Sequence, residues 1–518
     1  MLTPEPGEDH GVVAIIGGGP AGLTAADRLL ELGRSAVVFE QGTRVGGLAQ
    51  TVEYKGFRFD IGGHRFFTKV SIIQQLWREV LGPEFLWRPR LSRIYYRGRF
   101  FDYPLRPLNV LRNLGFVTSV AVVCSYLKSL LVPVRPEKSF ADWVSNRFGR
   151  RLLNMFFATY TEKVWGTPCT SIGAQWAAQR IKGLSLRTAV TNMLLPRRKG
   201  THIKTLIEEF EYPRLGPGQM WEAFQTRIAR RGGSIELETT VTTIEHDGAR
   251  VSAIVVERAG TSTAHAPSHV ISTMPMRHLV RALSPPAPPE IVEAADKLRY
   301  RDFLTVALII DQRDVFPDNW IYIHDDTVKV GRIQNFKNWS PDMVPDSSRT
   351  CLGLEYFCFE GDGLWTMTDD ELVALATNEL AGMGMVTRER VLDGCVVRMP
   401  KAYPVYDETY ATSVETVRAY LARFENLYLV GRNGMHKYNN QDHSMLTAML
   451  AVRNIAGERH DLWAVNVDEE YHEIARPDST LAREIRAMAK TQPRVPIAAP
   501  ELKPRSSTVP STVAQAPL

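Results

Sequence analysis

Three glycines and one acidic residue near the N-terminus have the types and spacing of a dinucleotide-binding site. Gly17, Gly19 and Gly22 fit the pattern G-x-G-x-x-G, and Glu40 follows them. In this pattern Gly17 allows a tight turn, Gly19 lets a pyrophosphate approach the backbone, and Gly22 lets a helix pack closely on a strand. An acidic side chain at the position of Glu40 can accept hydrogen bonds from an adenosine ribose. The spacing therefore predicts that the chain binds a dinucleotide.

The three glycines and Glu40 must be positioned by the strands and the helix in which they lie. Residues 12–16 form a continuous apolar, mostly β-branched run, which is typical of a strand buried on both faces of a parallel sheet. A helical run follows and ends before Gly33, and residues 36–39 form a second buried strand that finishes at Glu40. The helix N-terminus would offer unpaired N–H groups and a positive dipole end to the pyrophosphate. The unit is therefore predicted to be α/β.

The residues after Glu40 distinguish between dinucleotides. Arg44, Gly46 and Gly47 extend the pattern to E-x-x-x-R-x-G-G. This extension resembles the FAD fingerprint of the glutathione-reductase-type flavoproteins, in the branch that contains amine oxidases, protoporphyrinogen oxidase and UDP-galactopyranose mutase. NAD-binding domains do not normally carry it, so FAD is the expected cofactor, with NAD(P)H or another electron donor as a candidate partner.

Two further segments resemble the mutases of this branch. The turn Gly62-Gly63-His64 matches a turn that passes beside the isoalloxazine ring there; the alternative is a structural β-turn. Residues 159–166 contain the run Y-T-x-K-x-W-G, whose aromatic side chains line the nucleotide end of the mutase cleft. Aromatic packing between helices is the alternative interpretation of residues 159–166.

The third segment, residues 427–449, resembles the strand–glycine–loop–helix that closes the FAD site in these flavoproteins. The mutases read G-R-x-x-x-Y-x-Y-x-D-M here, and Gly431, Arg432, Tyr438 and Asp442 match, while the middle of the motif is replaced by N-N-Q-D-H-S. His443 is interpreted equally well as a base beside the flavin and as a helix-start residue hydrogen-bonded to backbone.

A mutase motif with a departure lies at residues 331–339. The mutases have R-x-x-E-x-K at this place, and Arg332 and Lys337 match it, whereas Asn335 replaces the glutamate. An arginine here could bind a diphosphate bidentately. The alternative is a surface Arg–Lys pair, and the missing glutamate suggests a different sugar or acceptor. Tyr403 and Tyr103 follow the order of the family's "YP" and "YPL" elements.

The resemblance implies three sets of site residues. The expected catalytic residues are His64, Arg332, Tyr403, Tyr438 and His443. The expected cofactor-binding residues are Gly17, Gly19, Gly22, Glu40, Arg44, Gly46, Gly47, Gly62, Gly63, His64, Val241, Gly431, Arg432, Gln441, Asp442, His443 and Ser444. The expected substrate-binding residues are Tyr103, Tyr160, Lys163, Trp165, Arg332, Lys337, Tyr403 and Tyr438. No metal site is expected.

The implied fold is α/β: a glutathione-reductase-type FAD-binding Rossmann domain with a helical insertion and an antiparallel-sheet substrate domain. The expected FAD-binding parts are residues 1–75, 213–275 and 425–475. Residues 76–212 are expected to be mainly helical, residues 276–424 to form the antiparallel-sheet domain, and residues 491–518, rich in Pro, Ser, Thr and Ala, to be a disordered tail.

The composition of the chain restricts the partners and the cellular compartment that can be expected for it. The chain has 518 residues and a net charge of +5, which does not suggest nucleic acid as a partner. Five cysteines without metal spacing and a polar, acidic N-terminus suggest a reducing cytoplasm, with the thiols buried. The apolar stretch 114–134 is interrupted by polar residues, so a buried helix is expected there. A helix on the membrane surface is the alternative, and a membrane-spanning helix is not expected.

Two functions stay open. The first is a UDP-galactopyranose mutase-like isomerase that acts on a nucleotide sugar through reduced FAD. The second is an oxidoreductase of the amine oxidase or protoporphyrinogen oxidase type, which transfers hydride from its substrate to FAD; Asn335 and the N-N-Q-D-H-S loop favour it. A non-enzymatic flavin-bearing scaffold is not favoured, because many polar groups expected around the flavin are retained. The mutase-like function is preferred.

Overall fold

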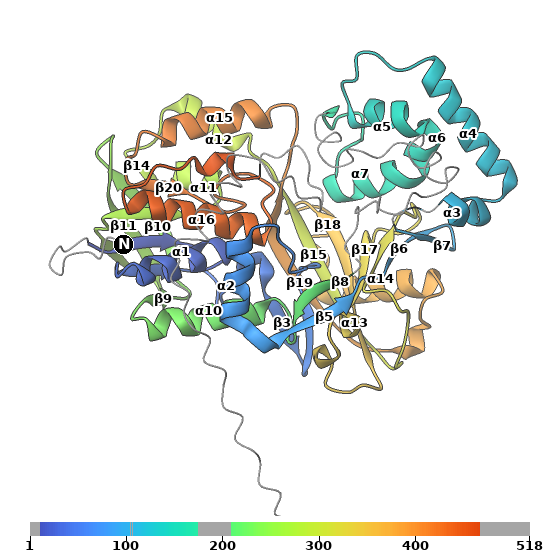
Figure 1. Cartoon of the computed structure of the whole chain (residues 1–518), viewed down its shortest axis with the longest axis horizontal. Helices are drawn as coiled ribbons and strands as arrows, with labels where there is room; N and C mark the ends of the chain where they lie inside the picture. Colours follow the sequence, from blue (N-terminus) through green and yellow to red (C-terminus); the bar gives the residue numbers. More distant parts are fainter. Residues whose placement is uncertain (1–10, 104, 106, 175–208, 467–518) are drawn as a thin grey trace, which may run out of the picture. The chain divides into compact units, whose positions relative to one another are not determined.

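The computed structural model describes residues 11–103, 105, 107–174 and 209–466 (Figure 1), all of which belong to the first of two compact units, Met1–Ala475. The N-terminal residues 1–10, residues 175–208 of the segment expected to be mainly helical, and the predicted tail 491–518 therefore lie outside the described residues.

The dinucleotide motif lies on a five-stranded parallel sheet of order β20-β13-β1-β2-β9. Its strands come from distant parts of the chain: β1 (Val13–Ile16), β2 (Ala36–Phe39), β9 (Ser234–Glu236), β13 (His269–Ser272) and β20 (Leu427–Leu429). All four residues of β1 are buried, as expected for the strand between two parallel neighbours. Helices α1 (Pro20–Glu31), α10 (Gly218–Arg230) and α16 (Gln441–Ile455) pack beside this sheet (Figure 1).

A seven-stranded sheet forms the second layer, in the order β19-β15-β18-β17-β16-β6-β7. Its strands are β6 (Ser92–Tyr96), β7 (Arg99–Asp102), β15 (Tyr300–Ile310), β16 (Trp320–Ile323), β17 (Arg332–Asn335), β18 (Thr350–Cys358) and β19 (Val391–Pro404). Every neighbouring pair is antiparallel except β16 with β6. The α/β fold expected from the sequence is confirmed in this combination of a parallel and a largely antiparallel sheet.

Alternation along β15 explains why all eleven of its residues are buried. Leu304, Val306 and Leu308 pack with residues of α14 (Asp369–Gly382). Ala307 and Ile309 pack instead with a cluster that includes residues of β4 (Phe57–Asp60). Each face of the strand thus has its own apolar cover.

The other described strands form one four-stranded sheet and two two-stranded sheets. The four-stranded sheet has the order β12-β11-β10-β14, with β10 (Thr240–His246), β11 (Val251–Arg258), β12 (Thr261–His265) and β14 (Leu283–Ser284). Two further pairs are β3 (Thr51–Tyr54) with β4, and β5 (Phe85–Pro89) with β8 (Glu209–Pro213). The remaining helices near these sheets are α2 (Ser71–Leu81), α11 (Met276–Arg281), α12 (Pro289–Asp296), α13 (Phe336–Trp339) and α15 (Tyr410–Leu421).

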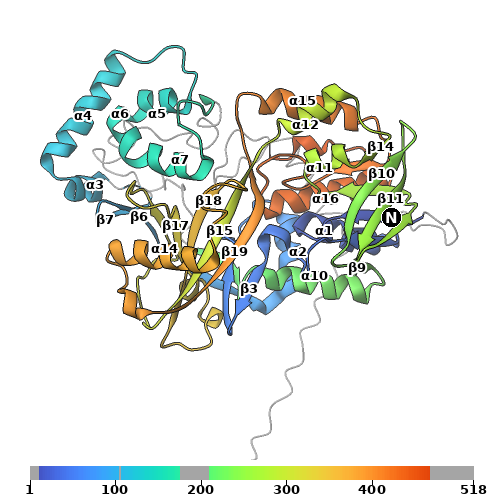
Figure 2. The same ribbon diagram turned by 180° about the vertical axis from the view of Figure 1, so that it is seen from behind.

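The segment expected to be mainly helical is mixed. It contains β5, β6 and β7 before its helices, and the hairpin of β6 and β7 joins the edge of the seven-stranded sheet. The helices that follow are α3 (Pro107–Leu114), α4 (Phe116–Leu131), α5 (Phe140–Phe148), α6 (Arg150–Leu152) and α7 (Thr159–Trp165). Figure 2 shows α3 to α7 clustered beside that edge, with α4 on the outer side of the cluster.

The expectation of a buried helix at residues 114–134 is wrong. Only Ser119 and Val122 of α4 are buried, while Phe116 is 84% and Leu131 is 83% exposed. The sequence alone could not distinguish an apolar helix inside a core from one on the surface, because both carry the same residue types. Cys124, on the same helix, is exposed and departs from the expectation of buried thiols.

Candidate functional site

A cavity of about 780 Å³ lies at the carboxyl ends of the parallel strands. Residues that end or closely follow four of these strands line it: Ile16, Gly17, Phe39, Glu40, Thr273 and Gly431. The opposite wall comes from the seven-stranded sheet and includes Phe303, Trp320, Tyr322, Arg332, Gln334 and Tyr403. Ligands of doubly wound folds bind at this edge of the parallel sheet.

The glycines form the backbone cradle that the motif predicts. Gly17 has a φ of +99°, and a Cβ on Gly22 would lie 1.9 Å from the carbonyl oxygen of Gly17, so the turn requires both glycines. Gly19 and Gly47 line the cavity and face each other, since a Cβ on Gly47 would lie 3.3 Å from Cα of Gly19. Helix α1 begins after Gly19 without a side-chain cap. Its first amides are therefore available to an anionic ligand.

Glu40 lines the cavity and shapes the loops around it. Its carboxylate accepts hydrogen bonds from the backbone N–H of Gly18 at 2.6 Å and of Gly42 at 2.7 Å. The side chain thus holds the phosphate-binding turn against the end of β2, in addition to the ribose contact expected from the sequence.

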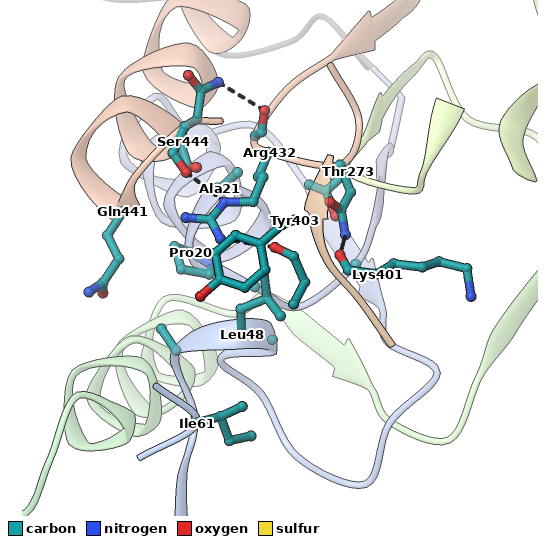
Figure 3. A pocket seen from close by; sticks show the side chains of 18 of the residues that line it. Pro20, Ala21, Leu48, Ile61, Thr273, Lys401, Tyr403, Arg432, Gln441 and Ser444 are labelled. Carbon is teal, nitrogen blue, oxygen red and sulfur yellow. Dashed lines mark hydrogen bonds between the residues drawn. The ribbon is translucent and has the colours of Figure 1, made fainter. Parts of the chain in front are cut away.

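A second helix N-terminus faces the cavity. Asn440, Gln441, Asp442 and Ser444 at the start of α16 are lining residues. The side-chain oxygen of Gln441 is buried and has no hydrogen-bond partner among the described residues. Figure 3 shows Gln441 and Ser444 on the same side of the cavity as Pro20 and Ala21 of α1. The uncapped start of α1, the start of α16 and an unsatisfied polar atom fit a ligand with phosphate and hydroxyl groups, such as FAD.

The surroundings of His443 decide between its two interpretations in favour of the helix start. It does not line the cavity, and its Nδ1 accepts a hydrogen bond from the backbone N–H of Asn440 at 3.4 Å, which completes a capping box at α16. The structure therefore supports the helix-start interpretation of His443, and its role as a catalytic base beside the cofactor stays a prediction.

A buried ion pair lies in the wall of the cavity. Nε of Arg332, on β17, donates to Oε2 of Glu355, on β18, at 2.5 Å. Gln334 donates to the other oxygen of Glu355 at 2.8 Å, and Gln334 itself accepts from the indole N–H of Trp339 at 3.0 Å. Because side chains alternate along β17, Arg332 and Gln334 face the cavity together.

Burial and charge act in opposite directions on this pair. Burial is the largest single effect on the pKa of Arg332 and would lower it, but the Glu355 carboxylate acting together with Tyr160, Tyr403 and Tyr322 raises that pKa well above its ordinary value. Burial raises the pKa of Glu355, and Arg332 and Gln334 oppose this rise. Arg332 is consequently a permanent cation held in a nearly buried position.

Two tyrosines and a second arginine lie beside Arg332. The rings of Tyr403 and Tyr438 stack with centroids 5.7 Å apart at 17°. The guanidinium of Arg432 lies 4.7 Å from the Tyr438 ring centroid and 5.7 Å from that of Tyr403. Figure 3 shows Arg432 next to the Tyr403 ring, and backbone carbonyls of Ala402 and Asn439 accept its hydrogen bonds. All four side chains line the cavity.

His64 lies in the Gly62–Gly63 turn and lines the cavity. Burial, with Arg432 and Arg332 close by, lowers the pKa of His64 to about 3. Its Nδ1 is 3.1 Å from the carbonyl oxygen of Gly62, which can only accept, so Nδ1 carries the proton and Nε2 is left as an acceptor. His64 is therefore a neutral hydrogen-bonding group at pH 7 and not a readily protonated base.

Two expected substrate-binding lysines belong to the scaffold. Nζ of Lys163 donates to the backbone carbonyls of Ile323, Asp325 and Val330, and Nζ of Lys337 donates to those of Arg313, Ser347 and Arg349. Neither lysine lines the cavity, so both expectations are corrected. Each lysine supplies the hydrogen-bond donors that three nearby backbone carbonyl groups would otherwise lack.

Asn335 also lies away from the cavity. It follows Gln334 on β17, and its side chain donates to the carbonyl oxygen of Phe316. The alternation of a strand thus places this departure from the mutase motif on the opposite face from Arg332. Asn335 therefore gives no direct evidence for a different sugar or acceptor, and that difference stays a prediction.

The remaining expected aromatic residues lie behind the lining. Tyr160 stacks on His324 at 4.9 Å and meets Tyr322 edge-on, and Tyr103 meets Tyr322 at 5.0 Å. Trp165 is buried against Tyr403, Tyr406 and Tyr438. These three side chains support cavity residues without lining the cavity themselves.

Three expected cofactor-binding residues likewise do not line the cavity: Gly22, Arg44 and Gly46. Gly22 acts through packing, and the N–H of Gly46 donates to the carbonyl oxygen of Gly18 at 2.8 Å. Arg44 is exposed. Apart from these and His443, the expected cofactor-binding residues, including Val241 on β10, are lining residues.

The sequence reasoning missed Glu355, Gln334, Tyr322, Trp320 and Trp339. A signal for Glu355 was available, because it is the single charged residue in the otherwise apolar run of β18, all of whose residues are buried. A carboxyl in such a strand needs a partner. Gln334 stands two residues after Arg332, so strand alternation would have placed it on the same face.

The model of one protein family matches residues 20–456, most of the chain, and its description is "Flavin containing amine oxidoreductase". The chain belongs to this family. Family membership implies a flavin cofactor, for which FAD is the usual form, and the cradle described above fits it. When bound, a flavin would be held by the starts of α1 and α16, Glu40 and the Gly62–Gly63 turn.

Solved structures show the same fold at low identity. A crystal structure of reduced UDP-galactopyranose mutase matches with a TM-score of 0.75 and 21% identity, covering 88% of this chain and 98% of the mutase. A putative protoporphyrinogen oxidase from Exiguobacterium sp. 255-15 matches with a TM-score of 0.66 and 19% identity, over 88% and 100% of the two chains. Putrescine oxidase bound to putrescine matches with a TM-score of 0.57 and 16% identity, over 86% and 99%.

Among curated proteins, an inactive all-trans-retinol 13,14-reductase from Danio rerio is 50% identical over 50 residues. This match spans 10% of the chain and only 8% of the length of that relative.

Proposed function

We propose that the chain is an FAD-dependent enzyme that acts on a nucleotide-sugar-like substrate through reduced FAD, as UDP-galactopyranose mutase-like isomerases do. The observation that carries this proposal is the fixed cation Arg332 beside the stacked pair Tyr403 and Tyr438. A substrate with a phosphate or diphosphate next to a sugar ring matches a permanent guanidinium next to flat aromatic faces.

The position of Arg332 supports an anionic substrate. Its ion pair with Glu355 uses Nε, while Nη2 lies 3.9 Å from the position that a Cβ on Gly62 would occupy. The terminal amino groups are therefore near the turn that carries His64. They can donate to a phosphate while Glu355 keeps the guanidinium in place.

The titratable groups of the lining are suited to hydrogen bonding. Burial, together with Tyr438, raises the pKa of Tyr403, so its phenol keeps its proton at neutral pH. His64 is neutral and offers Nε2 as an acceptor. When bound, reduced FAD would supply the electron pair, and these residues would orient the sugar hydroxyls and exclude water from it.

The second candidate is an oxidoreductase of the amine oxidase or protoporphyrinogen oxidase type. The observation that favours it is the start of α16, where the residues that replace the mutase motif, Asn440, Gln441 and Ser444, line the cavity. Asn335 no longer favours it, because that side chain lies on the far face of β17. In the mutase-like function NAD(P)H or another electron donor is a proposed partner that reduces the flavin, whereas in the oxidoreductase the substrate itself reduces the flavin and an acceptor must reoxidise it.

One anaerobic experiment separates the two functions. The purified protein, as isolated and after reduction with dithionite, is incubated with a panel of nucleotide sugars, and the products and the flavin spectrum are followed together. We expect conversion only by the reduced protein, with its spectrum unchanged through turnover. Stoichiometric bleaching of the oxidised flavin by an amine or another hydride donor, with no conversion of any nucleotide sugar, would establish the oxidoreductase instead.

Matched variants connect the result to the site. Arg332→Lys keeps the charge but removes the planar fork, so we expect the Michaelis constant to rise about tenfold or more. Lys337→Arg is the control in the same motif, because Lys337 lies outside the cavity. Equal activity of both variants would remove Arg332 from the proposed substrate site.

A further inference from the structure

Helix α4 presents an apolar face to solvent. Phe116, Val117, Val120, Val123, Leu127 and Leu131 are all exposed, by 44% to 84%. Their spacing of one, three and four residues places them along one side of the helix. Soluble monomers rarely expose a contiguous apolar patch of this kind without a binding role. We call these six residues the α4 face.

The charges around the α4 face are all of one sign along the chain. The sequence contains no acidic residue between Asp102 and Glu137, whereas Arg112, Lys128 and Arg135 lie in this stretch and are exposed. The next helices add to them, because Arg150 and Arg151 of α6 are exposed and the backbone N–H of Arg151 donates to Oγ of Ser125 on α4 at 3.1 Å.

The geometry of α3 and α4 suits helices that lie on a membrane surface better than helices that span a membrane. Among the described residues no single helix is long and apolar enough to span a membrane, although Leu108–Leu114 and Phe116–Leu131 together meet the criteria of length and composition. These two helices are bent by 120° at Gly115, whose φ is +76°. A spanning helix needs about 20 apolar residues, and α4 has only 16 residues in all, including Lys128.

We propose that the α4 face docks onto an anionic lipid bilayer, with the apolar side chains in the interface and the flanking arginines and lysine on the headgroups. Apolar burial and headgroup attraction act together in helices that lie in the membrane plane. Lys128 can extend its ammonium group to the headgroups from beside the apolar residues. This docking is independent of the substrate proposed above.

A second copy of the chain fits the α4 face less well. In a two-fold symmetric dimer built on this face, Arg112, Lys128 and Arg135 of one copy would lie near those of the other. The same stretch of chain offers no carboxylate to pair with them. Like charges across an interface oppose association, whereas anionic headgroups attract them.

The test is sedimentation of the full-length protein with vesicles of phosphatidylcholine alone and of phosphatidylcholine mixed with phosphatidylglycerol. We expect binding to the mixed vesicles that weakens as salt is added. The double substitution Phe116→Asp/Val117→Asp should lower the apparent partition constant by at least about a hundredfold, because two large apolar contacts are lost. Trp87→Asp/Leu392→Asp is the matched control, since these exposed apolar residues lie on β5 and β19.

Three outcomes would overturn the proposal. The first is absence of wild-type binding to the mixed vesicles, and the second is equal loss of binding in the control variant. The third is concentration-dependent self-association in sedimentation velocity that Phe116→Asp/Val117→Asp abolishes, without vesicle binding, which would assign the face to a second copy. Circular dichroism and thermal unfolding check that the variants are folded.

Discussion

Arg332 and Glu355 stand directly opposite each other on the antiparallel strands β17 and β18, and their side chains form an ion pair within the cavity wall. The register of two strands therefore sets the position of the cation that the proposed substrate would meet. Each partner is in a place where its charge would be costly alone, because both side chains are nearly removed from water.

Removing one partner of this pair should destabilise the protein. Glu355→Gln leaves the Arg332 charge buried without its counterion, so we expect the free energy of unfolding to fall by about 3–5 kcal/mol. Denaturant titration followed by fluorescence measures this change. In the double variant Arg332→Met/Glu355→Gln the loss should be smaller than the sum of the two single losses. Additive losses would mean that the two side chains do not interact.

Glu40 should matter for FAD affinity through the loop that it holds. Glu40→Ala removes the acceptor of the Gly18 and Gly42 amides, so the phosphate-binding turn loses its anchor on β2. We expect FAD to bind more weakly by about 1.5–3 kcal/mol, measured by flavin fluorescence titration. Glu222→Ala, at an exposed position of α10, is the control. Unchanged affinity for Glu40→Ala would separate this residue from the cofactor site.

Two glycines of the N-terminal unit should respond very differently to alanine. A Cβ on Gly22 would lie 1.9 Å from a backbone oxygen, so Gly22→Ala must move α1 away from the turn and should abolish stoichiometric flavin binding. Gly33 has a φ of +73°, and a Cβ added there would meet nothing within 4 Å, so Gly33→Ala should cost only about 1–2 kcal/mol of stability. Absorbance of the purified variants and their Tm values test both statements.

Asp60 should make stability fall as the pH rises. Burial raises the pKa of Asp60 from 3.8 to about 8, although hydrogen bonds from Tyr212 and Thr51 oppose the rise. The folded protein therefore binds this proton more tightly than the unfolded chain does. Its contribution is fully present below about pH 4 and is lost as the pH rises through about 8.

The measurement is Tm against pH for the wild type and Asp60→Asn. The asparagine cannot ionise, so we expect the variant to lose less stability than the wild type between pH 5 and 8, a window inside the interval from 3.8 to about 8. Glu257→Gln, at an exposed position of β11, should follow the wild type. Parallel curves for Asp60→Asn and the wild type would contradict the assignment.

The sequence predicted the parts of the fold that local patterns encode. The strand at residues 36–39 has the expected bounds, and the strand expected at residues 12–16 is found at Val13–Ile16. The ion pair of Arg332 with Glu355 was not expected, because it depends on which strands become neighbours. Such a pairing between segments is not encoded by the pattern of either segment alone.

In the candidate site, too, local patterns predicted some residues, whereas the places of others depend on the tertiary structure. Gly17, Gly19 and Gly47 line the cavity as predicted, since a backbone cradle follows from spacing. Lys337 matched a motif but lies outside the cavity, because its motif passes from β17 into α13, where the direction of side chains changes. The surface position of α4 was also beyond the sequence, as its residue types suit either a core or an exposed interface.

The order of strands in the parallel sheet has a consequence for synthesis on the ribosome. Strand β1 pairs with β13, and Thr273, just after β13, donates to Ile16 across 257 residues of sequence. At about 5–20 residues per second, β1 waits roughly 13–50 s for β13, and β20 at the edge of the sheet is made later still. For about half of its synthesis the nascent chain thus carries β1 with one apolar edge unpaired, and this edge is open to wrong pairing before the parallel sheet that carries the glycine cradle is complete.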